Sequence, residues 1–136
     1  MKFQIYTRGI IFNQIGEVLL IKKRADQKYA GSKWIFPGGT LEWGEDIEET
    51  LARELKEEIN AQVSTLKIIG TRKMLTDDIH WQGIYYKVTA SDLKSLRNCE
   101  ENKHECIAWF SVDRLPLEID EIDRKHIALS QLLIIE

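Results

Sequence analysis

The sequence predicts a single-domain α+β fold in which two principal helices pack against several strands. Three observations lead to this prediction. The 136 residues are close to the common size of one domain. The chain is 43% hydrophobic and 30% charged, which is typical of a globular protein. No repeat, low-complexity tract or linker interrupts the chain, so we expect residues 1–136 to form one domain.

The first half of the chain is expected to contribute two strands, a basic loop and a helix. Residues 3–12 and 17–22 are rich in apolar and β-branched side chains and are joined by a short Asn/Gly turn. The basic loop covers residues 22–33, and a Pro-Gly-Gly turn follows at residues 37–39. The first helix is expected over residues 46–59, where one apolar stripe recurs every four residues: Ile47, Leu51, Leu55 and Ile59.

The second half is expected to contribute three strands and a C-terminal helix. Residues 62–74 and 79–90 have the character of two strands around a short acidic turn, and a polar loop follows at residues 91–103. A short strand is expected at residues 105–110. The last helix is expected over residues 120–134, with these side chains facing inward: Ile122, Ile127, Leu129, Leu132 and Leu133.

Three glutamates on the first helix are the strongest functional signal. Glu54, Glu57 and Glu58 stand at i, i+3 and i+4, so they share one part of the helix surface. At about 100° per residue, Glu58 and Glu54 fall beside the apolar stripe, on the side that packs on the protein. Carboxylates directed at a packed face are costly unless they are paired or bind a metal. Hard cations such as Mg²⁺ take oxygen ligands, so the spacing favours a metal site over an acidic surface helix.

Residues 39–61 resemble the Nudix box, G-x5-E-x7-R-E-U-x-E-E-x-G-U, in which U is a bulky aliphatic residue. Two positions differ from this pattern: Asn60 stands in place of the last glycine, and Ala61 in place of a larger aliphatic residue. Asn is the second choice for the left-handed conformation that ends a helix, so we expect Asn60 to be tolerated. The matching residues are Gly39, Glu45, Arg53, Glu54, Leu55, Glu57 and Glu58.

The resemblance implies an α/β/α sandwich around a mixed sheet over nearly the whole chain. It also implies hydrolysis of a nucleoside diphosphate linked to another moiety, with Mg²⁺ as the cofactor and Mn²⁺ as a substitute. Arg53 would orient a carboxylate and count among the catalytic residues, and Glu45 would organise the loop and the helix start. Which glutamate is the general base stays open. The metal ligands would be Glu54, Glu57, Glu58 and the carbonyl group of Gly38.

The expected substrate is a small nucleotide. The segments around Trp34, His80-Trp81 and Trp109 are similar to Nudix enzymes that hydrolyse nucleoside triphosphates, including those that remove 8-oxo-dGTP and other dNTPs from the pool. The reaction would yield a nucleoside monophosphate and pyrophosphate. Alternatives are a nucleotide-sugar or dinucleoside-polyphosphate hydrolase and a non-catalytic nucleotide sensor. Because neighbouring residues of a strand point to opposite faces, at most one of His80 and Trp81 can face the cleft. Substrate contacts are expected from Lys23 and Arg24 of the basic loop, from Gly39 and from Trp81.

Composition argues against several other classes. A net charge of −3 gives no signature of nucleic-acid binding, and no apolar run has the length of a membrane span. The two cysteines make a disulfide framework improbable, so a cytoplasmic location is expected. Cys99, His104 and Cys106 lack the paired spacing of a zinc site and are interpreted as structural. Glu100 and Glu101 are interpreted as solvated loop acids, with a role as a metal ligand or general base as the alternative. The sequence does not determine the oligomeric state, and a homodimer stays possible.

Overall fold

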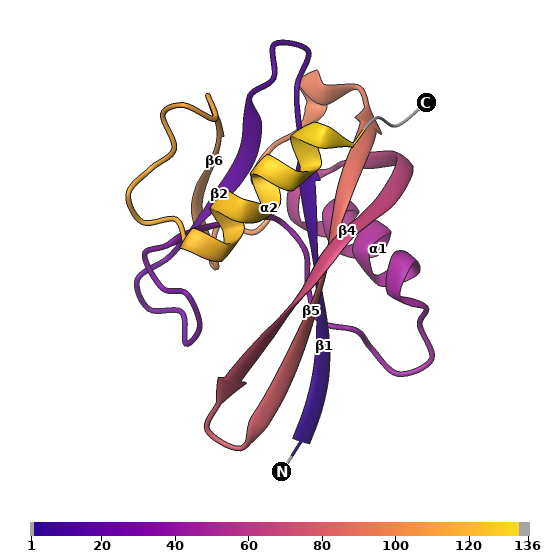
Figure 1. Cartoon of the computed structure of the whole chain (residues 1–136), viewed down its shortest axis with the longest axis vertical. Helices are drawn as coiled ribbons and strands as arrows, with labels where there is room; N and C mark the ends of the chain where they lie inside the picture. Colours follow the sequence, from indigo (N-terminus) through magenta and orange to yellow (C-terminus); the bar gives the residue numbers. More distant parts are fainter. Residues whose placement is uncertain (1, 134–136) are drawn as a thin grey trace.

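Two three-stranded sheets form the middle of the molecule, and a helix lies on each side of them (Figure 1). The structure is a computed structural model that describes residues 2–133. Neither α-helix in this part of the chain is long and apolar enough to cross a bilayer. The elements are β1 (Lys2–Ile11), β2 (Val18–Lys23), β3 (Trp34–Ile35), α1 (Ile47–Ile59), β4 (Gln62–Thr76), β5 (Ile79–Ser91), the short 3₁₀ helix η1 (Leu93–Ser95), β6 (His104–Phe110) and α2 (Glu121–Leu132).

The strand order explains how distant segments meet. The first sheet has the order β1-β5-β4, with β1 parallel to β5 and β4 antiparallel to β5. The second has the order β3-β2-β6, and both of its pairings are antiparallel. Strand β6 pairs Lys23 with His104, which brings the loop before β6 next to the end of β2. The expected mixed sheet is therefore present, and β1, β5 and β4 are its long strands.

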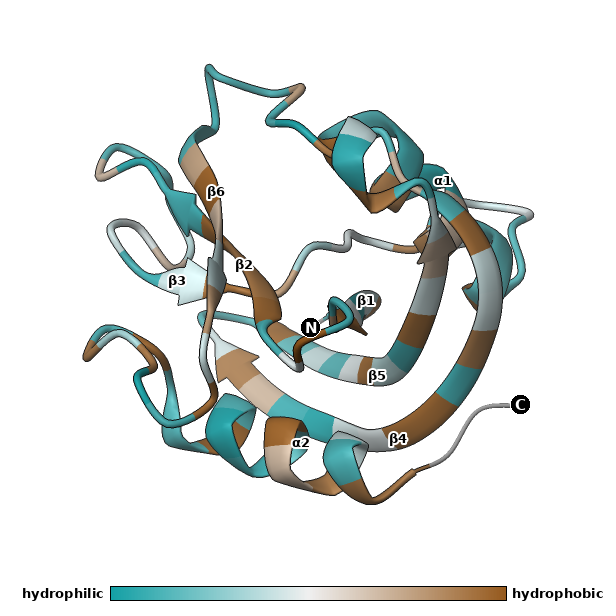
Figure 2. Cartoon of the chain, turned by 90° about the horizontal axis from the view of Figure 1, so that it is seen from above, coloured by the Kyte–Doolittle hydropathy of each residue, from teal (hydrophilic) through white to brown (hydrophobic). Residues whose placement is uncertain are grey.

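Two hydrophobic cores lie on opposite faces of the strands. Along β2, Leu19 and Ile21 belong to the core beneath α1, whereas Val18 and Leu20 belong to the core beneath α2. This alternation follows from the period of two in a strand. Figure 2 shows α2 along the outer side of the curved strand β4, with α1 on the other side of the sheet. The expected α/β/α arrangement is confirmed.

Helix α1 ends as its sequence predicts. Leu51, Leu55 and Ile59 are fully buried, in agreement with the apolar stripe. Asn60 has φ 60° and ψ 34°, which is the left-handed conformation, and its N–H donates to Lys56 O at 3.1 Å. Asn60 thus takes the place of the glycine in the helix-ending motif.

Helix α2 packs with a different face from the one predicted. Ile127 is buried as expected, but Ile122, Leu129 and Leu132 are 38%, 49% and 80% exposed. The buried face instead carries three polar side chains, Asp123, His126 and Ser130. The prediction was wrong because it counted apolar residues, whereas Arg72 and Tyr85 beneath the helix provide partners for polar ones. Leu133 caps the helix, and position 134 of the predicted helix lies outside the described residues.

Candidate active site

A cleft of about 580 Å³ lies beside the glycine turn and collects charged and aromatic side chains from most elements of the fold. Two of its carboxylates come from opposite sides of the sheet, Glu58 from α1 and Asp123 from α2. Its basic and aromatic lining residues include Tyr6, Arg8, Lys23, Lys28, Tyr29, Lys33, Trp34, Arg72, Trp81, Tyr85 and Lys103.

The glycine turn brings the backbone against β1 and against α1. Thr7 N donates to Gly39 O and Gly9 N donates to Pro37 O, both at 2.8 Å, so the turn lies along the edge of β1. A Cβ atom on Gly38 would collide with the backbone of Thr7, and one on Gly39 would collide with the carboxyl group of Glu54. The two glycines therefore allow a carboxylate and a backbone segment to approach closely at the edge of the cleft.

Glu58 is the most deeply buried carboxylate of α1. It is 4% exposed, and its Oε1 accepts a hydrogen bond from Gly38 N at 3.3 Å. Burial raises the pKa of Glu58 to about 8, although the charge of Arg8 acts in the opposite direction. Burial also raises the pKa of the neighbouring Glu54. A bound cation would relieve both groups, because a nearby positive charge favours the ionised carboxylate.

The structure adds Glu100 and His104 to this acidic group. Ligand atoms of Glu58, Glu100 and His104 all lie within 4.8 Å of one another. Glu100 and His104, interpreted from the sequence as a solvated loop acid and a structural residue, therefore lie beside the main glutamate. Cys99 and Cys106 are exposed thiols and do not belong to the group. No spacing in the sequence reveals this contact, because it depends on the pairing of β6 with β2.

Arg53 binds the other acidic side chains of the box. Its Nε lies 2.7 Å from Glu45 Oε2, and its Nη1 lies 3.0 Å from Glu54 Oε1 and 3.2 Å from Glu57 Oε2. The hydrogen bond from Arg53 holds the pKa of Glu45 at about 2. Glu45 also accepts from Glu42 N and from the Thr50 hydroxyl group, so it joins the loop to the start of α1. Of the three predicted metal-binding glutamates, Glu54 and Glu58 line the cleft, whereas Glu57 is half-exposed beside Arg53.

The donors present fit a divalent cation. Glu54, Glu58 and Glu100 line the cleft together with Gly38, so carboxylate oxygens are concentrated around a short stretch of backbone. Oxygen donors of this kind suit Mg²⁺ and Mn²⁺. The raised pKa of buried Glu58 shows that the site disfavours negative charge in the absence of such an ion.

Basic side chains line the cleft beside these carboxylates. Lys23 is among them, and burial lowers its pKa, with a further contribution from the charge of Arg8. Arg8 comes from β1 and was not identified from the sequence. Arg24, by contrast, donates through Nε to the carbonyl group of Glu101 and is not a lining residue. The structure thus brings Lys23, but not Arg24, to the cleft.

Aromatic rings form another part of the wall. Trp81 lines the cleft, and its Nε1 donates to Thr76 Oγ1 at 2.9 Å. Its ring packs edge-on against Tyr6 and Tyr29, with centroids 6.1 Å and 5.8 Å apart. His80 packs against Phe3 and does not line the cleft. As expected from strand alternation, one residue of the His80–Trp81 pair faces the cleft.

A second buried polar group lies beneath α2 and was not predicted. Arg72 Nη2 lies 2.9 Å from Asp120 Oδ2, and Arg72 Nη1 lies 3.8 Å from Asp123 Oδ1. Burial raises the pKa of Asp123 to about 6. The Tyr85 ring stacks on His126 with centroids 4.1 Å apart. Arg72, Tyr85, Asp120 and Asp123 line the cleft and give it hydrogen-bonding groups distinct from the acidic residues of α1.

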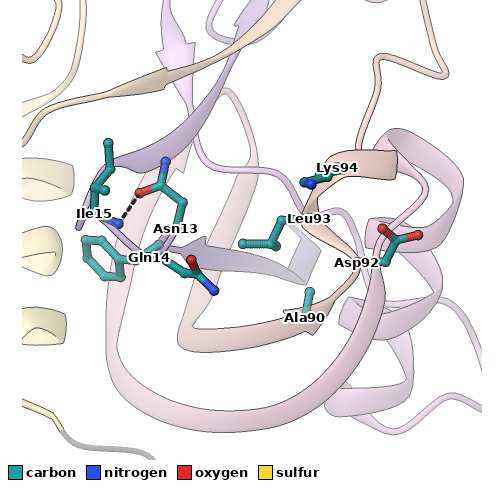
Figure 3. Close-up of a pocket in the computed structure, with 8 residues that line it drawn as sticks. Asn13, Gln14, Ile15, Ala90, Asp92, Leu93 and Lys94 are labelled. Carbon is teal, nitrogen blue, oxygen red and sulfur yellow. Dashed lines mark hydrogen bonds between the residues drawn. The ribbon is translucent and has the colours of Figure 1, made fainter.

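Another hollow of about 690 Å³ lies between the β1–β2 turn and η1 (Figure 3). Its wall is largely apolar, with Phe12, Ile15 and Leu93 among the lining residues. Asn13 Oδ1 accepts from Ile15 N at 3.1 Å, which shapes the turn at its rim. None of the predicted site residues lines this hollow.

The comparisons with known proteins agree with this geometry. The model of the NUDIX domain matches residues 2–130. The chain is 35% identical over 81 residues to an 8-oxo-dGTP diphosphatase from Proteus vulgaris, covering 60% of this chain and 71% of that protein. It is 30% identical over 99 residues to a putative nudix hydrolase from Caenorhabditis elegans, covering 73% of this chain.

The solved structures extend the likeness to the fold. The crystal structure of a MutT NUDIX hydrolase from Burkholderia pseudomallei superposes with a TM-score of 0.84 at 23% identity, covering 95% of this chain and 98% of that one. Because the NUDIX domain model matches residues 2–130, the chain belongs to the Nudix family. For several curated relatives, the C. elegans protein among them, the match spans only 26–39% of their length.

Proposed function

We propose that this protein is a Mg²⁺-dependent pyrophosphohydrolase that converts a nucleoside triphosphate to a nucleoside monophosphate and pyrophosphate. One observation supports this most: a single cleft holds the α1 carboxylates, several basic side chains and an aromatic wall. A nucleotide needs all three, since it has a phosphate chain that binds cations and a base that packs on rings. The relative from P. vulgaris is named an 8-oxo-dGTP diphosphatase, which favours a purine triphosphate within this class.

The residues of the chain have separable tasks in this proposal. Glu54, Glu57, Glu58 and the Gly38 carbonyl group hold the cation, and Arg53 keeps Glu54 in position through its 3.0 Å contact. When bound, the cation offsets charge on the phosphate oxygens and helps to make water a nucleophile. Lys23 and Gly39 contact the phosphate chain, and Trp81 contacts the base or sugar. Arg24 reaches the phosphates only if it leaves its contact with Glu101.

A product assay over a substrate panel tests the proposal. The full chain would be incubated with Mg²⁺ and dGTP, 8-oxo-dGTP, the other dNTPs and NTPs, ADP-ribose or diadenosine polyphosphates. Inorganic phosphate would be measured with and without added inorganic pyrophosphatase, and nucleotides would be separated by chromatography. We expect a monophosphate and phosphate that appears only when pyrophosphatase is present.

Other outcomes replace the proposal in defined ways. Selective cleavage of ADP-ribose or of a dinucleoside polyphosphate would show a different leaving group. Tight nucleotide binding without turnover would identify a sensor. Direct release of phosphate without added pyrophosphatase would contradict cleavage between the α and β phosphates.

A further inference from the structure

His104 is buried beside Glu58, and within residues 2–133 neither of its ring nitrogens makes a hydrogen bond. Its side chain is 4% exposed, and Nε2 lies 3.9 Å from Glu58 Oε2. Hydrogen bonds from nitrogen to oxygen measure about 2.7–3.2 Å, so this contact is too long to be one. Nδ1 is also buried and has no partner among residues 2–133. Buried polar atoms normally have partners, so the position of this imidazole calls for an explanation.

The spacing of these atoms fits coordination of one ion. Two ligand atoms that each lie about 2.1 Å from an ion are about 3.0 Å apart when adjacent and about 4.2 Å apart when opposite. The 3.9 Å between His104 Nε2 and Glu58 Oε2 falls in this range. Glu100 completes the group, with all three ligand atoms within 4.8 Å of one another. Small side-chain rotations would therefore bring the three residues around one cation.

We infer that His104 is a nitrogen ligand of the divalent cation that Glu58 and Glu100 bind in the cleft. The inference rests on the proposed function for the presence of that cation and adds a ligand outside the box. Its position is fixed by β6, because the pairing of Lys23 with His104 sets the strand beside the end of β2.

A nitrogen ligand changes which metal the site prefers. Mg²⁺ binds oxygen ligands and keeps several waters, whereas imidazole suits transition metals. Mn²⁺ accepts the carboxylates and tolerates the imidazole. The site should therefore favour Mn²⁺ over Mg²⁺ more strongly than the same carboxylates would without His104.

Pulsed electron paramagnetic resonance of bound Mn²⁺ tests the ligand directly. The full chain would be loaded with Mn²⁺ without nucleotide, so that no base nitrogen contributes, and electron spin echo envelope modulation would be recorded. We expect ¹⁴N modulation that changes to the ¹⁵N pattern when only histidine is ¹⁵N-labelled. His80 lies outside the cleft, so His80→Gln should keep the signal, and His104→Gln should lose it. Bound Mn²⁺ without histidine modulation in the unsubstituted protein would overturn the inference.

Calorimetric titration gives a second readout. The ratio of the Mg²⁺ to the Mn²⁺ dissociation constant should fall by about tenfold or more in His104→Gln and stay constant in His80→Gln. An unchanged ratio in a folded His104→Gln protein would contradict the inference. If that variant does not fold, the ¹⁵N-histidine modulation of Mn²⁺ in the unsubstituted protein still tests the inference. Turnover without nitrogen modulation would remove only this inference, whereas modulation without turnover would remove only the hydrolase proposal.

Discussion

Helices α1 and α2 lie on opposite faces of the sheet, and each places one buried carboxylate at the same cleft. Glu58 of α1 is 4% exposed and Asp123 of α2 is 5% exposed. Burial raises the pKa of both, to about 8 for Glu58 and about 6 for Asp123. Their neighbours differ. Asp123 has the Arg72 guanidinium at 3.8 Å, whereas ligand atoms of Glu100 and His104 surround Glu58.

This difference indicates which carboxylate would gain more from an added cation. Arg72 supplies positive charge to Asp123 from within the chain. Glu58 has two acidic neighbours, Glu54 and Glu100, and both raise its pKa further. The positive charge of Arg8 lowers the pKa of Glu58 but does not offset the effect of burial. We therefore expect a metal ion to matter on the α1 side and not on the α2 side, where Arg72 supplies the positive charge.

The largest effect should come from exchanging the two carboxylates for amides. Glu58→Gln should lower turnover by roughly 10³-fold, because a catalytic cation supplies several kcal/mol and about 1.4 kcal/mol is a factor of ten. The loss of turnover in Asp123→Asn should be at least tenfold smaller than the loss in Glu58→Gln. Steady-state rates at saturating Mg²⁺ measure both. Equal losses would mean that the two carboxylates do not differ in the way proposed.

The apolar side chains of the two helices should contribute differently to the free energy of unfolding. Leu55 of α1 is fully buried, so Leu55→Ala should lower the free energy of unfolding by about 2–5 kcal/mol. Leu129 of α2 is 49% exposed, so Leu129→Ala should change it by no more than about 0.5 kcal/mol. Urea unfolding of the metal-free proteins would compare them. A large loss at Leu129 would restore the inward face that was predicted from sequence.

The pH dependence of the free energy of unfolding above pH 6.5 should report mainly the ionisation of Glu58. Its folded pKa of about 8 lies above the ordinary 4.5, so the folded state holds the proton to higher pH than the unfolded state. The metal-free protein should therefore lose roughly 1–2 kcal/mol of stability between pH 6.5 and 8. Asp123, with a pKa of about 6, is half ionised at pH 6 and contributes little above pH 6.5, and His104, whose pKa is lowered to about 4, acts in the opposite sense below pH 6.5.

Unfolding in urea with a chelator at several pH values would measure this loss. Glu58→Gln should make the stability nearly constant from pH 6.5 to 8, whereas Asp123→Asn should keep the slope. A slope that persists in Glu58→Gln would assign the proton to another group.

Substitution of Glu57 should lower turnover much less than substitution of Glu58. Glu57 is half-exposed and bound by Arg53, so Glu57→Gln should lower turnover by about tenfold, which is well short of the loss for Glu58→Gln. The same steady-state assay applies. A loss as large as that of Glu58→Gln would place Glu57 at the cation on equal terms with Glu58.

The α1 side of the molecule was predicted well because its signals are local. The stripe of Leu51, Leu55 and Ile59 and the ending at Asn60 both follow from spacing within one helix. The burial of Glu58 also follows from its position on that helix. Each of these features depends on residues a few positions apart, where periodicity is informative.

The α2 side and the far wall of the cleft depend on contacts between distant segments. Asp123 is buried because Arg72 of β4 lies beneath it, and His126 is buried because it stacks on Tyr85 of β5. His104 reaches Glu58 only through the pairing of β6 with β2. No spacing in the chain encodes these pairings, so apolar counting chose the wrong face of α2, and the position of His104 beside Glu58 was not predicted.

Direct measurement of Mn²⁺ binding tests the central difference between the two sides. Free Mn²⁺ would be followed by its electron paramagnetic resonance signal during titration of the unsubstituted protein, Glu58→Gln and Asp123→Asn. We predict one tight class of ions in the unsubstituted protein, similar affinity in Asp123→Asn, and affinity at least about tenfold weaker in Glu58→Gln. Equal affinity in Glu58→Gln and the unsubstituted protein would contradict a cation held by the carboxylates of α1.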